Sequence, residues 1–547
     1  MIKLMNGRIL TLALAVAFLA LSVRANIYVT NLRMLTNSVA GADVKITYIL
    51  NEPAAQGVAL NISSGSNLVR TLTVANGAQG TLFGSNVVTW NSTDSNGIPV
   101  AAGSYEVSVT ATGSSRSNWT QISHDSSPGN YTFAARGLSV NNNSNSLYYG
   151  RVFIGNAAEN PSGTNAGDQD TIIKLNADGS FAADGSNSNG GYGFVDLGDD
   201  GAPQKMRVAE DDRLYMMDLD QRQLAAFDML VSTNEIVMTT ADYNENPFWI
   251  NGSIDNGLGW FSMDITDANT TNALIWLGQW DSGGAGIWNW NLSNGVAYTT
   301  NDIGNWVVDV GGSLGVAASG GLMVDTNFDI FVGQYLTDTG DTNSDCMEFT
   351  NWNRGLSYGG APISNGVAWS VSSTNNTFLG VYDTTIDSRQ HPNYVACALN
   401  GGTVAGGIRI LDASSGQVVT NLDTTNQYYV TAWDNVGNLY AASDTSRLLR
   451  VFSPPVSTNQ AMASTTVQVA PGTAGITVSG TTVTIYFAGS SSDLPSQITL
   501  QSTAALDAPF VTVAGAVATE ISPGVFQFTT TVSGSAQFYR ISDAGPQ

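Results

Sequence analysis

The stretch AWDNVGNLYAASDTSRLLRVF, residues 432–452, decides the fold of the largest part of the chain. An apolar residue leads into an Asp/Asn/Gly turn, the strand Leu-Tyr-Ala-Ala follows, and a second polar turn precedes a strand that ends in Val451-Phe452. Asparagine, aspartate and glycine favour tight turns, and the apolar runs between them have the composition of short strands. The stretch therefore predicts a turn-strand-turn-strand unit.

Weaker copies of this unit recur along the chain. They are VAEDDRLYMMDLDQRQLAAFD (208–228), SIDNGLGWFSMDI (253–265) and LMVDTNFDIFVGQY (322–335), with further candidates at 146–156, 295–302 and 393–402. Their spacing is roughly 35–65 residues, and a period of about 40–50 with short strands is typical of propeller blades. Long stretches of helical periodicity are missing, which argues against an α/β fold. We therefore expect a six- or seven-bladed β-propeller over 136–455, and its best copies resemble NHL-type propellers.

The region 26–112 predicts a separate β-sandwich. Apolar residues alternate along VKITYIL, and Asn96-Gly97 and Pro99 punctuate the chain before the alternating strand of 103–112. The order VKITYILNEPAA, NLVRTL, NVVTWNSTDSNGIPVAAGSYEVSVTAT resembles the FlgD Ig-like domain, except that Ser92 follows Trp90-Asn91 where that family often has glycine. The resemblance implies an Ig-like spacer of the kind found in exported bacterial proteins.

Two further regions complete an all-β organisation. Residues 113–135 are rich in Ser, Asn and Gly and predict a linker. Residues 456–547 predict a small C-terminal β-sandwich, with a hairpin around Ser479-Gly480. Within it, LQSTAALDAPFVTVAG followed by QFYRI resembles a terminal β-sandwich of exported bacterial proteins.

The N-terminus and the charge point to export. Residues 1–25 combine a basic start, a short apolar run and small residues before a cut after Ala25, which predicts a secretory signal peptide. A retained membrane anchor is the minor alternative, since the run is shorter than the roughly 20 residues that span a bilayer. The net charge of −24 disfavours nucleic acid and anionic lipid as partners. We expect a secreted or cell-surface protein without membrane insertion after signal cleavage.

One window of the propeller region has an unusual composition. From Gln223 to Asn353 there is no lysine or arginine, and the window holds eight of the 12 tryptophans. Exposed tryptophan rings stack on sugars, so one hypothesis is a glycan- or cation-binding face, with these ligand-binding residues: Trp276, Trp280, Trp288 and Trp290. The alternative is that tryptophan fills the space between blades, and we favour it because large aromatic residues are usually buried.

The loop TDTGDTNSDCMEF (337–349) is a candidate calcium site. Asp338, Asp341, Asn343 and Asp345 offer oxygen ligands at closely spaced loop positions, which suits calcium. The loop is no EF-hand, because Cys346 stands where glycine is needed and Trp352 where the bidentate glutamate should be. The alternative is a plain solvated turn.

Catalytic signals are sparse. The only histidines, His124 and His391, lie near no motif, which disfavours a zinc site built on histidine clusters. Gly311-Gly312-Ser313-Leu314-Gly315 matches G-x-S-x-G, but that motif needs a strand-turn-helix setting and here lies in a Gly/Ser-rich β region. Cys346 and Cys397 either form a disulfide or are two small buried residues.

The sequence therefore predicts a non-enzymatic binding or scaffold protein whose propeller meets a glycan, a cation or a cell-surface protein. A propeller-based carbohydrate-active or lactonase-like enzyme is the second hypothesis, and a purely structural matrix protein is the third. Propellers serve all three roles, so the fold does not choose among them.

Overall fold

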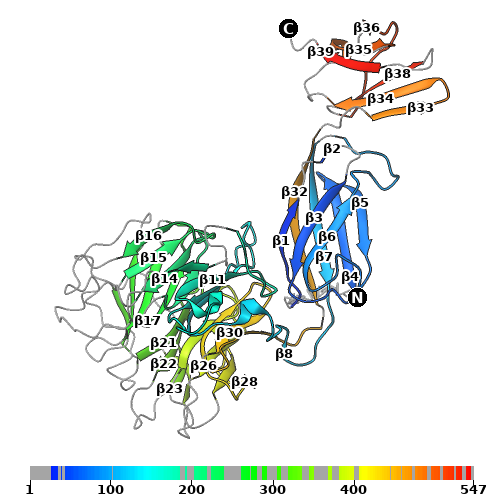
Figure 1. Ribbon diagram of the computed structural model, residues 1–547. Helices are drawn as coiled ribbons and strands as arrows, with labels where there is room; N and C mark the ends of the chain where they lie inside the picture. The colour runs from blue at the N-terminus through cyan, green and yellow to red at the C-terminus, as the bar shows by residue number, and fades with distance from the viewer. Residues whose placement is uncertain are drawn as a thin grey trace, which may run out of the picture.

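The structure is a computed structural model built almost entirely of strands in three units (Figure 1). It describes residues 26–543 with the exception of 35–37, 40–42, 102, 185–190, 194–202, 219–222, 239–259, 271–272, 280–285, 292–304, 310–317, 336–343, 350–366, 373–380, 400–405, 444, 458, 471–474, 489–494, 505–508, 523–524 and 532–537. The expected signal peptide lies outside this range. Among the described residues, no helix is long and apolar enough to cross a membrane.

The first unit is the expected Ig-like sandwich. One sheet has the order β1 (Val29–Met34), β3 (Val44–Leu50), β6 (Gly84–Trp90). The other has the order β2 (Ser38–Val39), β32 (Gln460–Ala470), β7 (Gly103–Thr112), β4 (Gly57–Ser64), β5 (Asn67–Val74). The alternation seen in the sequence places Val44, Ile46, Tyr48 and Leu50 in the core around Trp90.

Strand β32 corrects the expected domain boundary. We assigned its residues to the C-terminal sandwich, but β32 pairs antiparallel with β7 along its length, from Gln460 opposite Thr112 to Val469 opposite Gly103. Ala461, Val467 and Val469 enter the same core as β3 and β4, and this burial explains why the strand returns there. The propeller is therefore inserted between two neighbouring strands of the Ig-like sandwich.

The second unit is a β-propeller, and its described strands form six four-stranded antiparallel sheets. In order from the inner to the outer strand, the blades are β9 (Ala135–Val140), β10 (Val152–Asn156), β11 (Thr171–Leu175), β12 (Gly191–Gly193); β13 (Met206–Val208), β14 (Leu214–Asp218), β15 (Gln223–Phe227), β16 (Asn234–Met238); β17 (Trp260–Thr266), β18 (Leu274–Gln279), β19 (Gly286–Asn291), β20 (Asn305–Asp309); β21 (Ala318–Val324), β22 (Ile330–Tyr335), β23 (Ser344–Phe349), β24 (Val367–Ser372); β25 (Val381–Ile386), β26 (Tyr394–Leu399), β27 (Gly407–Asp412), β28 (Val418–Leu422); and β29 (Tyr428–Trp433), β30 (Leu439–Ser443), β31 (Leu449–Ser453), β8 (Thr120–Gln121).

The inner strands form a closed ring, because each of β9, β13, β17, β21, β25 and β29 contacts the next and β29 contacts β9. The ring is tight between β21 and β25. A Cβ atom on Gly320 would lie 1.8 Å from the carbonyl oxygen of Val381, and one on Gly321 would lie 1.9 Å from the backbone nitrogen of Thr384. Glycine is required there because the two backbones approach more closely than any side chain allows.

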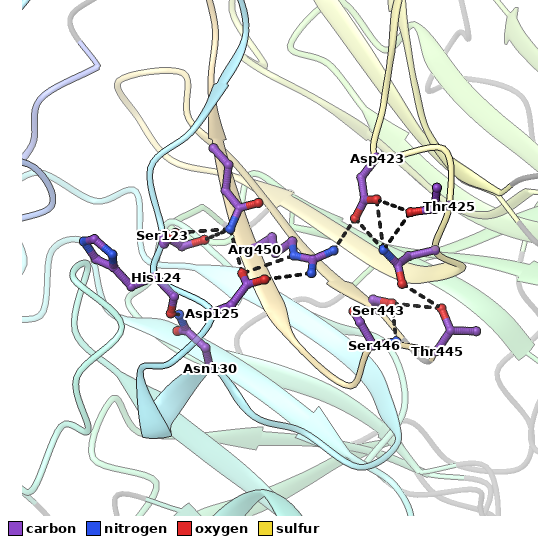
Figure 2. Close-up of polar contacts among 12 residues, drawn as sticks. Ser123, His124, Asp125, Asn130, Asp423, Thr425, Ser443, Thr445, Ser446 and Arg450 are labelled. Carbon is purple, nitrogen blue, oxygen red and sulfur yellow. Dashed lines mark hydrogen bonds and ion pairs between the residues drawn. The ribbon is translucent and has the colours of Figure 1, made fainter.

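Strand β8 is the outer strand of the last blade, and it lies in the segment expected to be a linker. It pairs with β31 through Gln121 opposite Phe452 and Thr120 opposite Ser453. Next to this pairing, Arg450 lies between Asp125, which follows β8, and Asp423 of the preceding blade (Figure 2). We call Arg450, Asp125 and Asp423 the closure cluster. It joins the first propeller residues to the last.

The third unit lies beyond the end of the Ig-like sandwich that faces away from the propeller (Figure 1). One sheet has the order β33 (Gly475–Ser479), β34 (Thr482–Ala488), β38 (Val525–Thr531), β37 (Thr519–Ser522), and the other has the order β36 (Val511–Thr512), β35 (Ile498–Thr503), β39 (Phe538–Asp543). Phe487, Phe526 and Phe528 pack in the core with Ile498 and Leu500. The unit is thus a small sandwich that begins after β32 rather than at 456.

Candidate functional site: the cavity between propeller and sandwich

Buried polar contacts fix the propeller against the Ig-like sandwich. The backbone nitrogen of Asn26 donates to Asn459 Oδ1 at 2.8 Å, and Asn438 of the last blade donates through Nδ2 to the carbonyl oxygen of Asn26 at 2.9 Å. Glu52 of the sandwich pairs with Arg116, and the two side chains are 6% and 16% exposed. Buried polar groups with satisfied partners hold a fixed geometry, so we treat the two units as one body at this junction.

A network of buried charges fills the centre of the propeller at this end. Asp264 of β17 accepts a hydrogen bond from Arg389 Nη1 at 2.7 Å and lies 3.8 Å from Arg207 Nε. Asp383 of β25 lies 3.3 Å from Lys205 Nζ and 3.6 Å from Arg207 Nη2. We call these five residues the channel network. They connect three of the six blades, the second, third and fifth, and each charge in the network has an opposite charge beside it.

Backbone groups complete the channel network. Val324 donates its N–H to Asp264 Oδ2 at 2.7 Å, and Thr431 donates its N–H to Asp383 Oδ2 at 2.9 Å. Burial lowers the pKa of Lys205 to about 8, although Asp383 opposes this effect. Burial alone would lower the pKa of Arg389, but Asp264 raises it above its ordinary value. The channel network is therefore a structural plug, meaning that it fills the centre of the propeller, and its two carboxylates are paired with the cations of Lys205, Arg207 and Arg389.

A cavity of about 910 Å³ lies above this plug, between the end of the propeller and the Ig-like sandwich. Arg207 and Arg389 form part of its base, and Tyr28, Ala461 and Met462 of the sandwich line its opposite wall. Much of the remaining lining comes from the turns that follow the inner strands, including Asn142, Asn145, Glu210, Asn269, Gln390, His391 and Asn435. Its volume is that of a ligand pocket, and two domains build it.

One of these turns holds a carboxylate that has no cation beside it among the described residues. Asp434 is fully buried, and it accepts hydrogen bonds from the backbone N–H of Val436 at 3.0 Å, from the backbone N–H of Asn438 at 2.8 Å and from Asn438 Nδ2 at 2.7 Å. Burial raises the pKa of Asp434 to about 7 against the effect of these hydrogen bonds. The Asp-Asn-Val-Gly-Asn motif of 434–438 therefore shapes the turn at the cavity edge.

The structure places the predicted tryptophan face in the interior. Trp276, Trp288 and Trp290 are 0%, 0% and 2% exposed, while Trp280 lies outside the described residues. Trp288 and Trp290 pack in the core shared by the second and third blades, and Trp276 donates to Thr266 Oγ1 at 3.0 Å. Their interior positions leave no surface on which a sugar could stack. For these three residues the structure agrees with the favoured alternative, that tryptophan fills the blades, and not with the hypothesis of an exposed binding face, because blade cores need large apolar side chains.

The other predicted sites fall largely outside the described residues. This holds for Asp338, Asp341, Asn343 and Ser313, while Asp345 lies in β23. Elsewhere in the described chain, no group of three or more His, Cys, Asp or Glu could hold a metal ion. The calcium loop thus stays a prediction.

The histidines and the described cysteine have separate roles. His124 stands between Ser123 and Asp125, but its ring lies 5.1 Å from that of Phe83, and in Figure 2 it points away from Arg450. These three neighbours therefore form no catalytic triad. His391 lines the cavity. Cys397 is a free, buried thiol in β26, so it behaves as a small core residue.

Sequence reasoning missed the cavity, although a signal for it existed. In each repeat the turn after the first strand must lie at the same end of the propeller. Aligning the copies on that turn would have gathered Asn142, Glu210, Asn269, Gln390 and Asn435 at one end. No comparable pattern in the sequence predicts that Tyr28, Ala461 and Met462 of the Ig-like sandwich line the cavity.

A family model of the FlgD Ig-like domain matches residues 34–115. The match confirms the resemblance of the N-terminal unit and ends just after β7, so it covers neither the propeller nor β32. A search of curated proteins finds no match for the chain.

The solved structures similar to this chain include β-propeller proteins. A calcium-binding protein, regucalcin, from Agrobacterium tumefaciens is 9% identical with a TM-score of 0.36, over 62% of this chain and 95% of that one. A catalytically inactive virginiamycin B lyase from Staphylococcus aureus with quinupristin is 10% identical with a TM-score of 0.34, over 76% and 99%. An auxiliary nutrient binding protein from Bacteroides ovatus is 10% identical with a TM-score of 0.34, over 78% and 98%. Scores this low carry no argument about function, and the fold assignment rests on the sheets themselves.

Proposed function

We propose that this protein is a secreted or cell-surface, non-catalytic binding protein that takes its ligand in the cavity between propeller and Ig-like sandwich. The observation that carries the proposal is the cavity itself, since about 910 Å³ of space lies between two units that buried contacts hold together. A preformed cavity of this kind loses little conformational entropy when it binds.

The charges at the base of the cavity support binding rather than catalysis. A general acid or base needs a proton that it can exchange with a substrate. Arg389 pairs with Asp264, and Arg207 lies beside both Asp264 and Asp383. Arginine and aspartate side chains that are paired with one another position neighbouring strands and are not open to exchange a proton with a substrate. The N-terminal sequence pattern and the acidic composition support an extracellular location.

A matched pair of variants on β32 tests the proposal. Met462 is 72% exposed and lines the cavity, whereas Ser464 is exposed on the same face of the strand and does not line it. We expect Met462→Trp to weaken ligand binding at least tenfold while Ser464→Trp leaves it unchanged, as measured by calorimetry on residues 26–547 with ligands selected by thermal shift. Equal binding by both variants, or no ligand in a broad screen, would favour the structural-matrix role instead.

A further inference from the structure

We infer that the ligand of the cavity is an uncharged, polyhydroxylated molecule, namely a neutral oligosaccharide. The inference rests on the proposed function and names the chemical class of ligand. It follows from which polar groups of the lining are already engaged within the protein and which are open.

The charged side chains of the lining are engaged. Arg207 and Arg389 belong to the channel network, and Arg389 also donates to the carbonyl oxygen of Val324. Asp387 accepts the backbone N–H groups of Asn393 at 2.8 Å and Tyr394 at 3.1 Å. A charged ligand gains affinity when an opposite charge is available to it, and here that charge would have to leave an existing partner.

Glu210 is also engaged within the protein, although by a longer hydrogen bond. Its Oε2 accepts the backbone N–H of Ala268 at 3.2 Å, so it links the β13–β14 turn of the second blade to the β17–β18 turn of the third. Glu210 also raises the pKa of Arg389, after the larger effect of Asp264. Asp434 is buried in its own turn, where the backbone N–H of Asn438 donates to it. His391 also lines the cavity, and a neutral imidazole offers one donor and one acceptor that suit a hydroxyl.

The open groups are carboxamides, and they come from separate parts of the molecule. Asn142, Asn269 and Asn435 donate through Nδ2 to the carbonyl oxygen of Trp433, the carbonyl oxygen of Glu210 and the hydroxyl of Tyr149, at 2.9, 2.6 and 3.1 Å. Within the described chain, no donor reaches their Oδ1 atoms. These amide oxygens are therefore oriented by the protein and free to accept hydrogen bonds.

Two lining side chains keep both of their amide functions open. Asn145 and Gln390 make no side-chain hydrogen bond to another described residue, and each offers a carbonyl acceptor and an NH₂ donor. They stand on the first and fifth blades, on different sides of the ring. Such groups match hydroxyls, which donate and accept, and they supply no charge that would favour an ionic ligand.

The experiment compares neutral and charged glycans on the same protein. Residues 26–547 and the variants Met462→Trp, Ser464→Trp and Asn145→Ala/Gln390→Ala are titrated by calorimetry with cello-, xylo- and manno-oligosaccharides, with oligogalacturonate and with a sulfated heparin oligosaccharide. Titrations are run at low salt and at 0.5 M NaCl. We expect a neutral oligosaccharide to bind with a Kd that changes less than twofold with salt, since no ion pair is screened.

The variants separate the two levels of the argument. Loss of neutral-glycan binding by at least tenfold in Met462→Trp and in Asn145→Ala/Gln390→Ala, with Ser464→Trp unchanged, supports the inference. Binding of only the acidic glycans, weakened by salt and abolished by Met462→Trp, would overturn the inference and leave the cavity as the binding site. Binding that Met462→Trp does not change would overturn the proposed function as well.

Discussion

The closure cluster and the channel network both join separate blades of the propeller through ion pairs, but they differ in burial. Both connect parts of the propeller that are far apart in sequence: Arg450 lies 325 residues from Asp125, and Arg389 lies 125 residues from Asp264. In the channel network the carboxylates Asp264 and Asp383 are 0% and 1% exposed. In the closure cluster Asp125 is 44% exposed.

This difference in burial decides what each cluster contributes. A buried ion pair gives little net stability compared with apolar packing, yet removing one partner leaves a desolvated charge behind. An exposed pair contributes less and is screened by salt. We therefore expect the channel network to fix the arrangement of the inner strands. We expect the closure cluster to make a smaller contribution to the stability of the pairing between β8 and β31. The following predictions test that distinction.

The largest effect should come from Asp264→Asn. The substitution keeps the side-chain volume but leaves Arg389 and Arg207 buried with one carboxylate fewer. We expect the free energy of unfolding to fall by about 3–5 kcal/mol, the usual cost of an uncompensated buried charge. The measurement is urea denaturation of residues 26–547, with exposed Asp43→Asn as the control.

A second variant keeps this prediction testable if Asp264→Asn is poorly folded. Asp264→Asn/Arg389→Met removes both charges, so it should recover part of the lost stability. If the single variant is as stable as the control, the channel network would not determine the stability of the inner ring.

An intermediate effect is expected for Arg450→Met. Methionine keeps the apolar part of the side chain but loses the contacts with Asp125 and Asp423. We expect a loss of about 1–2 kcal/mol, between the values typical of exposed and buried pairs. Hydrogen exchange should accelerate at Ile122, whose N–H donates to the carbonyl oxygen of Val451, and stay unchanged in the inner strand β17. Uniform acceleration across the propeller would contradict a local role in closure.

The two clusters also show where sequence reasoning stops. The local signals predicted the strands well: alternation along VKITYIL gave β3, and the repeat of 432–452 gave β30 and β31. Neither β8 nor β32 could be placed, because each is defined by a partner strand more than 300 residues away. Their own residues look like linker and terminal sandwich.

The candidate site was still less accessible to sequence reasoning. The composition of the acidic, tryptophan-rich window drew attention to Trp276, Trp288 and Trp290, which the structure buries. Composition does not distinguish an aromatic residue that fills a blade from one that binds a ligand, because both need a large apolar ring. The cavity residues are ordinary turn residues, and only the closure of the ring brings them together.

The last effect depends on pH and concerns Asp434, a buried carboxylate that lacks the cations of both clusters. Because burial raises its pKa to about 7 in the folded state, from about 3.9 in the unfolded chain, the folded protein binds more protons than the unfolded one between these values. Its contribution to stability is therefore complete below pH 3.9 and is lost as the pH rises through 7. The nearby Tyr28, Tyr149 and Tyr440 have pKa values above their ordinary range and stay neutral in this window.

Asp434→Asn should remove this dependence on pH. Asparagine still accepts the backbone N–H groups of Val436 and Asn438 but carries no proton to lose. Between pH 5 and 7, the free energy of unfolding of the natural protein should therefore fall relative to that of the variant, with a slope of at most about 1.4 kcal/mol per pH unit. Parallel profiles for the two proteins would mean that Asp434 is ionised throughout this range, and that amide hydrogen bonds alone can hold a buried carboxylate as firmly as the arginines hold Asp264.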